Sequence, residues 1–137
     1  DGTLPGILAY DGERPGGWCS VGPRADYPAL ERSRVLARVD DAPVWSVVCF
    51  FVARDARRRG LTHRLITAAV SHARKKGARI VEAYPVSPGP NGIPDASAYT
   101  GLEPAFRRAG FREVARRSPR RAVWRLRVSR ARPAARS

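Results

Sequence analysis

The most informative part of the chain is residues 52–62, which read Val52-Ala53-Arg54-Asp55-Ala56-Arg57-Arg58-Arg59-Gly60-Leu61-Thr62. They follow an almost unbroken apolar run, 44–52, and precede a segment, 61–73, whose apolar residues recur at helical spacing. The run predicts a central strand buried on both faces, and the spacing predicts an amphipathic helix. Because the first amides of a helix have no partner within it, a glycine-containing turn from strand to helix is typical of an anion site.

The segments on either side of this turn predict a mixed α/β (α+β) domain. Before the turn, we expect a β-hairpin with strands around 7–10 and 18–21, and then a connection over 23–39 with a short helix near 30–36. After the strand and helix just described, we expect a short strand at 79–86, a helix at 97–109, and a terminal hairpin of 111–114 with 122–128. A helix that crosses between two strands makes them parallel. The pattern therefore predicts a central mixed sheet with flanking helices.

Length and composition set the class of protein. The 137 residues fit one domain, which we assign to 1–129, followed by a basic tail at 130–137. No apolar run approaches the ~20 residues that span a bilayer, so a membrane protein is excluded. The net charge is +14, but 24 of the 26 cations are arginine, which coding bias can produce, so the charge carries little functional weight. The two cysteines, Cys19 and Cys49, are expected to be buried thiols in a reducing, cytoplasmic setting.

The segment Arg57-Arg58-Arg59-Gly60-Leu61-Thr62 resembles the cofactor loop of the GNAT (GCN5-related) N-acetyltransferases, which has the form Arg/Gln-x-x-Gly-x-Gly/Ala. It matches that form at Arg57 and Gly60 and departs from it at Thr62. The preceding Val52-x-x-x-Ala56 resembles the end of the family's cofactor strand, and 106–111 resembles its Tyr-x-x-x-Gly-Phe ending. The resemblance covers the element order from about Ile7 to Val128. It leaves the family's opening strand and helix pair unmatched.

The resemblance implies an N-acetyltransferase that moves an acetyl group from acetyl-CoA to a primary amine of a small molecule or peptide, by direct attack in a ternary complex. It places the cofactor's pyrophosphate on the amides from Arg58 to Thr62, its pantetheine arm beside the backbone of 50–52, and the arginines at its phosphates. The residues implied to contact acetyl-CoA are Phe50, Phe51, Val52, Arg57, Arg58, Arg59, Gly60, Leu61, Thr62, Tyr99 and Phe106.

Catalysis requires a base for the amine proton and an acid, or another means of neutralisation, for the departing thiolate. Phe106 stands where the family often has a tyrosine acid, and it carries no proton. Tyr99, where the family often has a cofactor-contacting asparagine, and Tyr84 are the candidate acids, and Glu82 is the candidate base. The alternative for each tyrosine is a structural role as a half-buried aromatic residue, and the alternative for Glu82 is a salt-bridged or sheet-edge glutamate.

Other functions remain open at this stage. His63 and His72 lie nine residues apart on one helix, so no metal site is expected. Cys49 has no adjacent base, which favours core packing over a nucleophile. Nine arginines and no acid from Arg116 to Ser137 suggest a nucleic-acid-binding module, but no recognition motif supports it. A non-catalytic acyl-CoA-binding protein of the same fold is a third reading. The acceptor is expected to be a neutral or anionic amine, or a peptide amine, and exposed sheet edges would invite a homodimer.

Overall fold

Six strands form one mixed sheet in the computed structural model, which describes residues 6–11, 14–53, 60–85 and 102–129. The strands are β1 (Gly6–Asp11), β2 (Arg14–Pro23), β3 (Trp45–Val52), β4 (Ile80–Ala83), β5 (Arg112–Arg116) and β6 (Ala122–Arg127). Their order across the sheet is β1-β2-β3-β4-β6-β5. The pair β3 and β4 runs parallel, and the other neighbouring pairs run antiparallel. The predicted mixed α/β class and both hairpins are confirmed.

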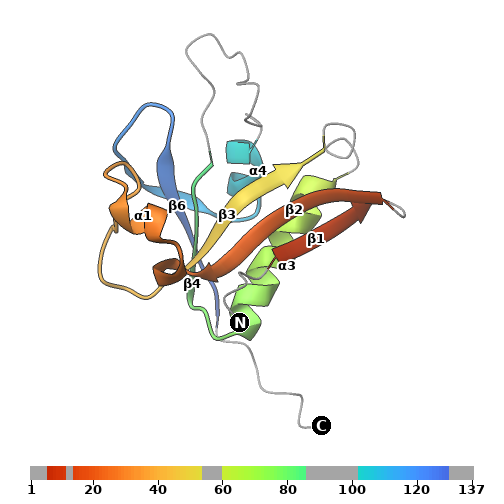
Figure 1. The fold of residues 1–137 in the computed structure, drawn as a ribbon, viewed down its shortest axis with the longest axis horizontal. Coiled ribbons are helices and arrows are strands. Elements are labelled where there is room, and N and C mark those ends of the chain that lie inside the picture. The colour runs from red at the N-terminus through yellow and green to blue at the C-terminus, as the bar shows by residue number, and fades with distance from the viewer. Residues whose placement is uncertain (1–5, 12–13, 54–59, 86–101, 130–137) are drawn as a thin grey trace.

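Helices cover both faces of this sheet (Figure 1). They are the 3-10 helix η1 (Arg24–Asp26), α1 (Pro28–Arg32), α3 (Leu61–Lys75) and α4 (Leu102–Arg108). The core is correspondingly divided into two clusters, one around α3 and one around Tyr27, Leu30 and Leu36. Alternation along the strands feeds both clusters, since Trp124 of β6 belongs to the first and its neighbour Val123 to the second.

Helix α3 follows from its sequence. Its buried residues recur at helical spacing and face β1, β2 and β3: Leu61, Thr62, Leu65, Ile66, Ala69 and Ala73. Cations occupy its last turn, where they interact favourably with the negative end of the helix dipole. Gly77 follows with a φ of 102°, a left-handed conformation that suits glycine. The predicted helix at 61–73 is therefore confirmed and extends to Lys75. No helix in the described part of the chain is long and apolar enough to cross a bilayer.

The connection between β2 and β3 differs from the prediction. We expected a helix near 30–36, but α1 begins at Pro28 and ends at Arg32. Proline is favoured at the first helical position because its φ is already helical and its missing N–H needs no partner there. After α1, the Ser33 hydroxyl accepts a hydrogen bond from the backbone N–H of Leu36 at 2.9 Å, so residues 33–36 form a turn instead.

Strand β3 is buried on both faces only in its first half, which corrects the prediction for 44–52. Phe51 is 59% exposed, and Cys49, expected in the core, is exposed as well. The reason is the length of the neighbouring strand, since the β4 ladder ends where Val47 pairs with Ala83. Trp18, directly opposite Phe51 on β2, is also 39% exposed. Cys19, in contrast, is fully buried as expected.

Helix α4 lies within the predicted helix at 97–109, of which residues 97–101 fall outside the described residues. It ends at Arg108. Gly110 follows with a φ of 104°, and the N–H groups of Gly110 and Phe111 bond back to the carbonyls of Arg107 and Phe106. This turn buries Phe111 against Phe106, with ring centroids 5.0 Å apart. The proposed tail at 130–137 also lies outside the described residues.

Candidate active site

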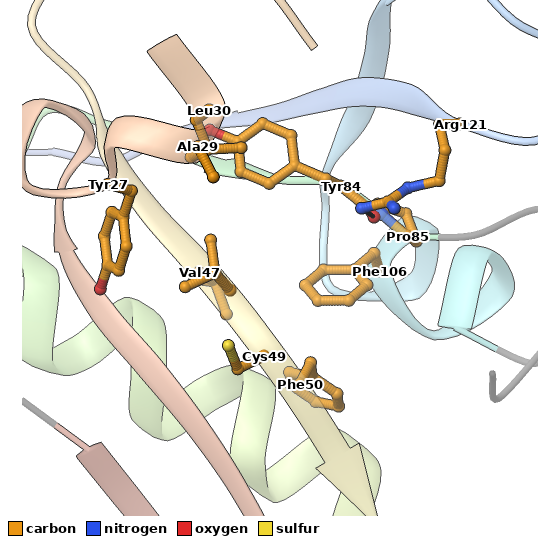
Figure 2. A pocket seen from close by; sticks show the side chains of 11 residues that line it. Tyr27, Ala29, Leu30, Val47, Cys49, Phe50, Tyr84, Pro85, Phe106 and Arg121 are labelled. Atoms are coloured by element: carbon orange, nitrogen blue, oxygen red, sulfur yellow. Dashed lines mark hydrogen bonds between the residues drawn. The ribbon is translucent and has the colours of Figure 1, made fainter. Parts of the chain in front are cut away.

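Strands β3 and β4 separate at the centre of the sheet. Their ladder consists of Trp45 with Val81, Ser46 with Glu82 and Val47 with Ala83. Beyond Val47, β3 continues to Val52, whereas the chain after β4 turns away at Tyr84 and Pro85. The backbone N–H and C=O groups of residues 48–51 that point to the β4 side thus have no strand partner in the described part of the chain. A cavity of about 360 Å³ lies at this separation (Figure 2).

A bulge in β3 lies beside the cavity. Ser20 pairs with Val48 and Trp18 pairs with Phe51, so two residues, Cys49 and Phe50, stand opposite Cys19 alone. Cys49 has a φ of 54°, a conformation that costs a non-glycine residue about 1–3 kcal/mol and is found mainly at functional sites. The bulge turns the strand and re-aims its side chains. Figure 2 shows the Cys49 sulfur among the side chains that line the cavity.

The cavity is mostly apolar and is assembled from five parts of the chain. Its described lining residues are Tyr27, Ala29, Leu30, Val47, Val48, Cys49, Phe50, Tyr84, Pro85, Phe106 and Arg121. Phe50 and Phe106, both predicted to contact the cofactor, meet here with ring centroids 5.4 Å apart. Phe51 and Val52 do not line it, because the Phe51 side chain is exposed and Val52 is buried in the core around α3.

Tyr84 and Glu82, two of the predicted catalytic residues, lie in one hydrogen-bond network. The Tyr84 hydroxyl donates to Glu82 Oε1 at 2.7 Å and lies 2.7 Å from Ser46 Oγ. Burial, and next the charge of Glu82, raises the pKa of the Tyr84 phenol, which therefore stays protonated. In Figure 2 this hydroxyl points toward Leu30 and away from Phe106. Glu82 itself is 1% exposed and is not among the residues that line the cavity.

Two arginines hold the Glu82 carboxylate. Arg125 Nε lies 2.7 Å from Oε2, and Arg24 Nη1 lies 3.3 Å from Oε1. Arg125 also binds Asp40 through both terminal nitrogens at 2.9 Å, and this contact lowers the pKa of the Asp40 carboxyl to about 2. Glu82 is therefore salt-bridged, as one of the sequence-based alternatives expected, and Tyr84 is the described cavity-lining residue that hydrogen-bonds to it.

Arg24 is a central residue that sequence reasoning missed. It is 2% exposed, and its Nη2 donates to the carbonyls of Leu30 at 2.9 Å and Leu36 at 2.7 Å while Nη1 contacts Glu82. The side chain thus holds the segment 30–36, whose first residue Leu30 lines the cavity, against β4. Arg24 and Glu82 are 58 residues apart in sequence, and nothing distinguishes this arginine from the other 23.

Arg121, in the turn before β6, was also missed. Its Nη2 donates to the backbone carbonyl of Tyr84 at 3.0 Å. Its Nε is buried and has no hydrogen-bond partner within the described ranges. Burial lowers the pKa of the Arg121 guanidinium from its ordinary value. The sequence could not single out Arg121 among 24 arginines, because what distinguishes it is its position in the cavity wall.

The N-terminus of α3 has the geometry expected of an anion site. Gly60 caps the helix with a φ of 76°, its carbonyl accepts the first helical bond from Arg64 at 3.2 Å, and the space around its Cα is open. The first turn holds no acidic residue and the cap makes no side-chain hydrogen bond, so nothing in the helix neutralises the positive end of its dipole. Leu61 and Thr62, the first two residues of the helix, are buried.

The other predicted cofactor residues fall outside the described part of the chain, and the two histidines of α3 lie apart from each other. Arg57, Arg58, Arg59 and Tyr99 lie outside the described residues. His63 is exposed, and His72 packs its ring against Trp45 with centroids 6.1 Å apart. Among the described residues, no group of three or more histidine, cysteine, aspartate or glutamate side chains could hold a metal ion.

Solved structures of similar fold are acetyltransferases. One is a putative acetyltransferase of the GNAT family from Desulfovibrio desulfuricans, with a TM-score of 0.62 and 18% identity over 90% of this chain and 68% of that one. A second is a GCN5-related N-acetyltransferase from Kribbella flavida, with a TM-score of 0.59 and 19% identity over 90% of this chain and 67% of that one. A third is the NatC complex bound to Gag peptide and CoA, with a TM-score of 0.62 and 10% identity over 90% and 71%.

Sequence comparison gives the same assignment. No curated protein sequence matches the chain. The family model of the acetyltransferase (GNAT) family, however, matches residues 2–91, which is more than half of the 137 residues. That range includes the separated pair β3 and β4, the bulge at Cys49 and the helix that begins after Gly60. The chain therefore belongs to the acetyltransferase (GNAT) family.

Proposed function

We propose that this protein transfers an acetyl group from acetyl-CoA to a primary amine of a small molecule or peptide. The observation that carries the proposal is the alignment of two features along β3. The strand separates from β4 and bulges beside an apolar cavity. Soon after the strand ends, α3 begins after Gly60, and no side chain of a described residue caps this end of the helix. A ligand with an anionic end and an extended polar arm fits this arrangement.

The described residues fit the two ends of acetyl-CoA. The unpaired amides at the start of α3 suit its diphosphate, with Gly60 allowing close approach of the backbone. The amide groups of its pantetheine arm can bond to the free edge of β3 as an added strand would. This binding mode keeps Phe50 and Val52 beside the arm, with Arg57, Arg58 and Arg59 as the proposed partners of the phosphates.

In the reaction, acetyl-CoA supplies an activated acyl carbon. The amine nitrogen bonds to that carbon as the carbon–sulfur bond breaks, the nitrogen gives up one proton, and the sulfur takes one. The apolar lining of the cavity favours the neutral, nucleophilic amine over its charged form. Phe106 carries no proton for the sulfur, so Tyr99 remains the proposed acid.

Tyr84 is the proposed route for the amine proton. Because its pKa is raised, it would receive a proton from the amine as it passes its own to Glu82, without holding a negative charge. The Glu82 carboxylate that would accept this proton is in contact with Arg24 and Arg125. Tyr84→Phe should lower kcat and alter its pH profile. Tyr27→Phe is the control, since Tyr27 also lines the cavity and its hydroxyl bonds to Ser20 at 2.9 Å. Equal kcat in both variants would remove Tyr84 from the chemistry.

The cofactor site is tested at the two ends of α3. Gly60 and Gly77 both have positive φ and open space around them, so valine at either position introduces similar strain. Acetyl-CoA at a hundredfold excess over Kd should stabilise the wild type by about 2.7 kcal/mol. Gly77→Val should keep this gain and Gly60→Val should lose it. A Gly60→Val protein that folds and binds acetyl-CoA normally would place the diphosphate elsewhere.

The same preparation separates this function from the other two readings. Acetyl-CoA binding without turnover across a panel of amines would indicate a non-catalytic acyl-CoA-binding protein. Steeply salt-dependent duplex binding with no response to acetyl-CoA would indicate a nucleic-acid-binding module. Both cysteines are free thiols, which supports a reducing compartment, and the cytoplasm is the proposed location.

A further inference from the structure

Arg121 places a positive charge in the wall of an otherwise apolar cavity. The side chain extends from the turn before β6, and Figure 2 shows its guanidinium beside Tyr84 and Pro85. One nitrogen is held by the carbonyl of Tyr84 at 3.0 Å, which fixes the orientation of the group. The Nε atom is buried and has no hydrogen-bond partner in the described part of the chain. A donor buried in this way is costly unless a ligand pairs with it.

The described part of the cavity offers this cation no counterion. Arg121 is the sole charged residue among the described residues that line it. The Tyr84 hydroxyl is neutral and donates to Glu82. The Glu82 carboxylate in turn is already bound by Arg24 and Arg125. The two arginines behind the wall therefore have carboxylate partners, while the one in the wall has none among the described residues.

We propose that Arg121 binds the carboxylate of the acceptor, and that the acceptors are therefore small amines with a carboxylate and an apolar side chain, as in an apolar α-amino acid. This inference rests on the proposed acetyl transfer and specifies its acceptor. A planar guanidinium matches the geometry of a carboxylate and recognises it with charge-assisted hydrogen bonds. The aromatic and aliphatic lining, which includes Tyr27, Leu30 and Phe106, would enclose the apolar side chain in about 360 Å³.

The test compares acceptors that differ in the carboxylate alone, such as phenylalanine and phenylalaninamide. Loss of a hydrogen-bonded charge pair should change binding by about tenfold or more. Arg121→Gln, which keeps a donor for the Tyr84 carbonyl, should raise KM for the acid at least ~tenfold and leave the amide nearly unchanged. Comparing each acceptor between wild type and variant cancels the different basicities of the two amines. Arg112→Gln, on exposed β5, removes the same charge away from the cavity and should behave as wild type.

Other results would overturn the inference. An equal loss with both acceptors would assign Arg121 to the departing sulfur or to folding. An unchanged KM for the amino acid in Arg121→Gln would show that no carboxylate binds at Arg121. Calorimetry with N-acetylphenylalanine and its amide measures the same preference without turnover, and loss of the acid's advantage in Arg121→Gln supports the inference. Acetyl-CoA binding in the same samples is measured separately, so its absence would count against the proposed function and not against this site.

Discussion

Replacing Arg24 with methionine should destabilise the protein strongly, although Arg24 is not one of the proposed cofactor-binding residues. Methionine approximates the volume of the side chain but removes its charge and all its donors. The change leaves Glu82 buried with Arg125 as its remaining cation and leaves the Leu36 carbonyl without its 2.7 Å donor. The Leu30 carbonyl keeps the N–H of Ser33 at 3.2 Å.

The size of the effect follows from these losses. Removing one partner of a buried ion pair costs about 3–5 kcal/mol, and the low end applies because Glu82 keeps Arg125. An orphaned buried carbonyl costs about 1–3 kcal/mol more. We therefore expect the free energy of unfolding to fall by about 4 kcal/mol, a large part of the about 5–15 kcal/mol typical of a domain.

Urea unfolding followed by tryptophan fluorescence measures this change. Arg38→Met is the matched control. Glu31 contacts Arg24 Nε at 3.3 Å and also binds Arg38, but Arg38 is exposed, so the unfolding midpoint of this variant should stay close to that of the wild type. If Arg24→Met does not fold, Arg24→Lys, which keeps the charge but has fewer donors, should show an intermediate loss. A loss below about 1 kcal/mol with an unchanged slope would refute the buried network.

Two further predictions concern thiol chemistry and pH. Iodoacetamide should modify Cys49, which is exposed at the cavity, and should spare Cys19, which is buried and whose pKa is raised to about 12. Mass spectrometry should locate the modification and should show that acetyl-CoA slows it. Modification of Cys19 before Cys49 would contradict the fold. Arg125 lowers the pKa of Asp40 from 3.8 to about 2, so this pair stabilises the fold fully above the unfolded pKa, and the contribution is lost as pH falls through about 2. Wild type and Asp40→Asn should converge in urea midpoint as the pH is lowered, and a constant difference would argue against the pair.

Local patterns in the sequence predicted most of the fold. The apolar spacing in α3, the β-branched run of β3 and the glycine at each end of α3 are properties of consecutive residues, and they predict elements directly. The helix near 30–36 was misplaced because the periodicity there is weak and the start signal at Pro28 was not given enough weight. The start of α3 after Gly60, where we propose an anion site, was predictable for the same local reason, since strand, turn and helix are contiguous.

The candidate site beyond that turn was predictable only in part. Glu82 and Tyr84 were identified as candidates, but their network depends on Ser46, Arg24 and Arg125, which approach from distant parts of the chain. Sequence position does not indicate which arginine will be buried when most of the cations are arginine. The exposure of Cys49 was likewise hidden, because an apolar run looks the same whether or not a neighbouring strand covers it.

By itself, the sequence determined where the chain forms strands and helices and where it turns from β3 into α3, because those choices depend on neighbours within a few residues. Tertiary structure alone decided that β4 ends at Ala83, that β3 bulges at Cys49, and that Arg24 contacts a carboxylate while Arg121 contacts none among the described residues. Burial and pairing of a charge depend on which segments meet after folding. Such contacts form between residues as far apart in sequence as Arg24 and Glu82, and no local sequence pattern encodes a contact over that separation.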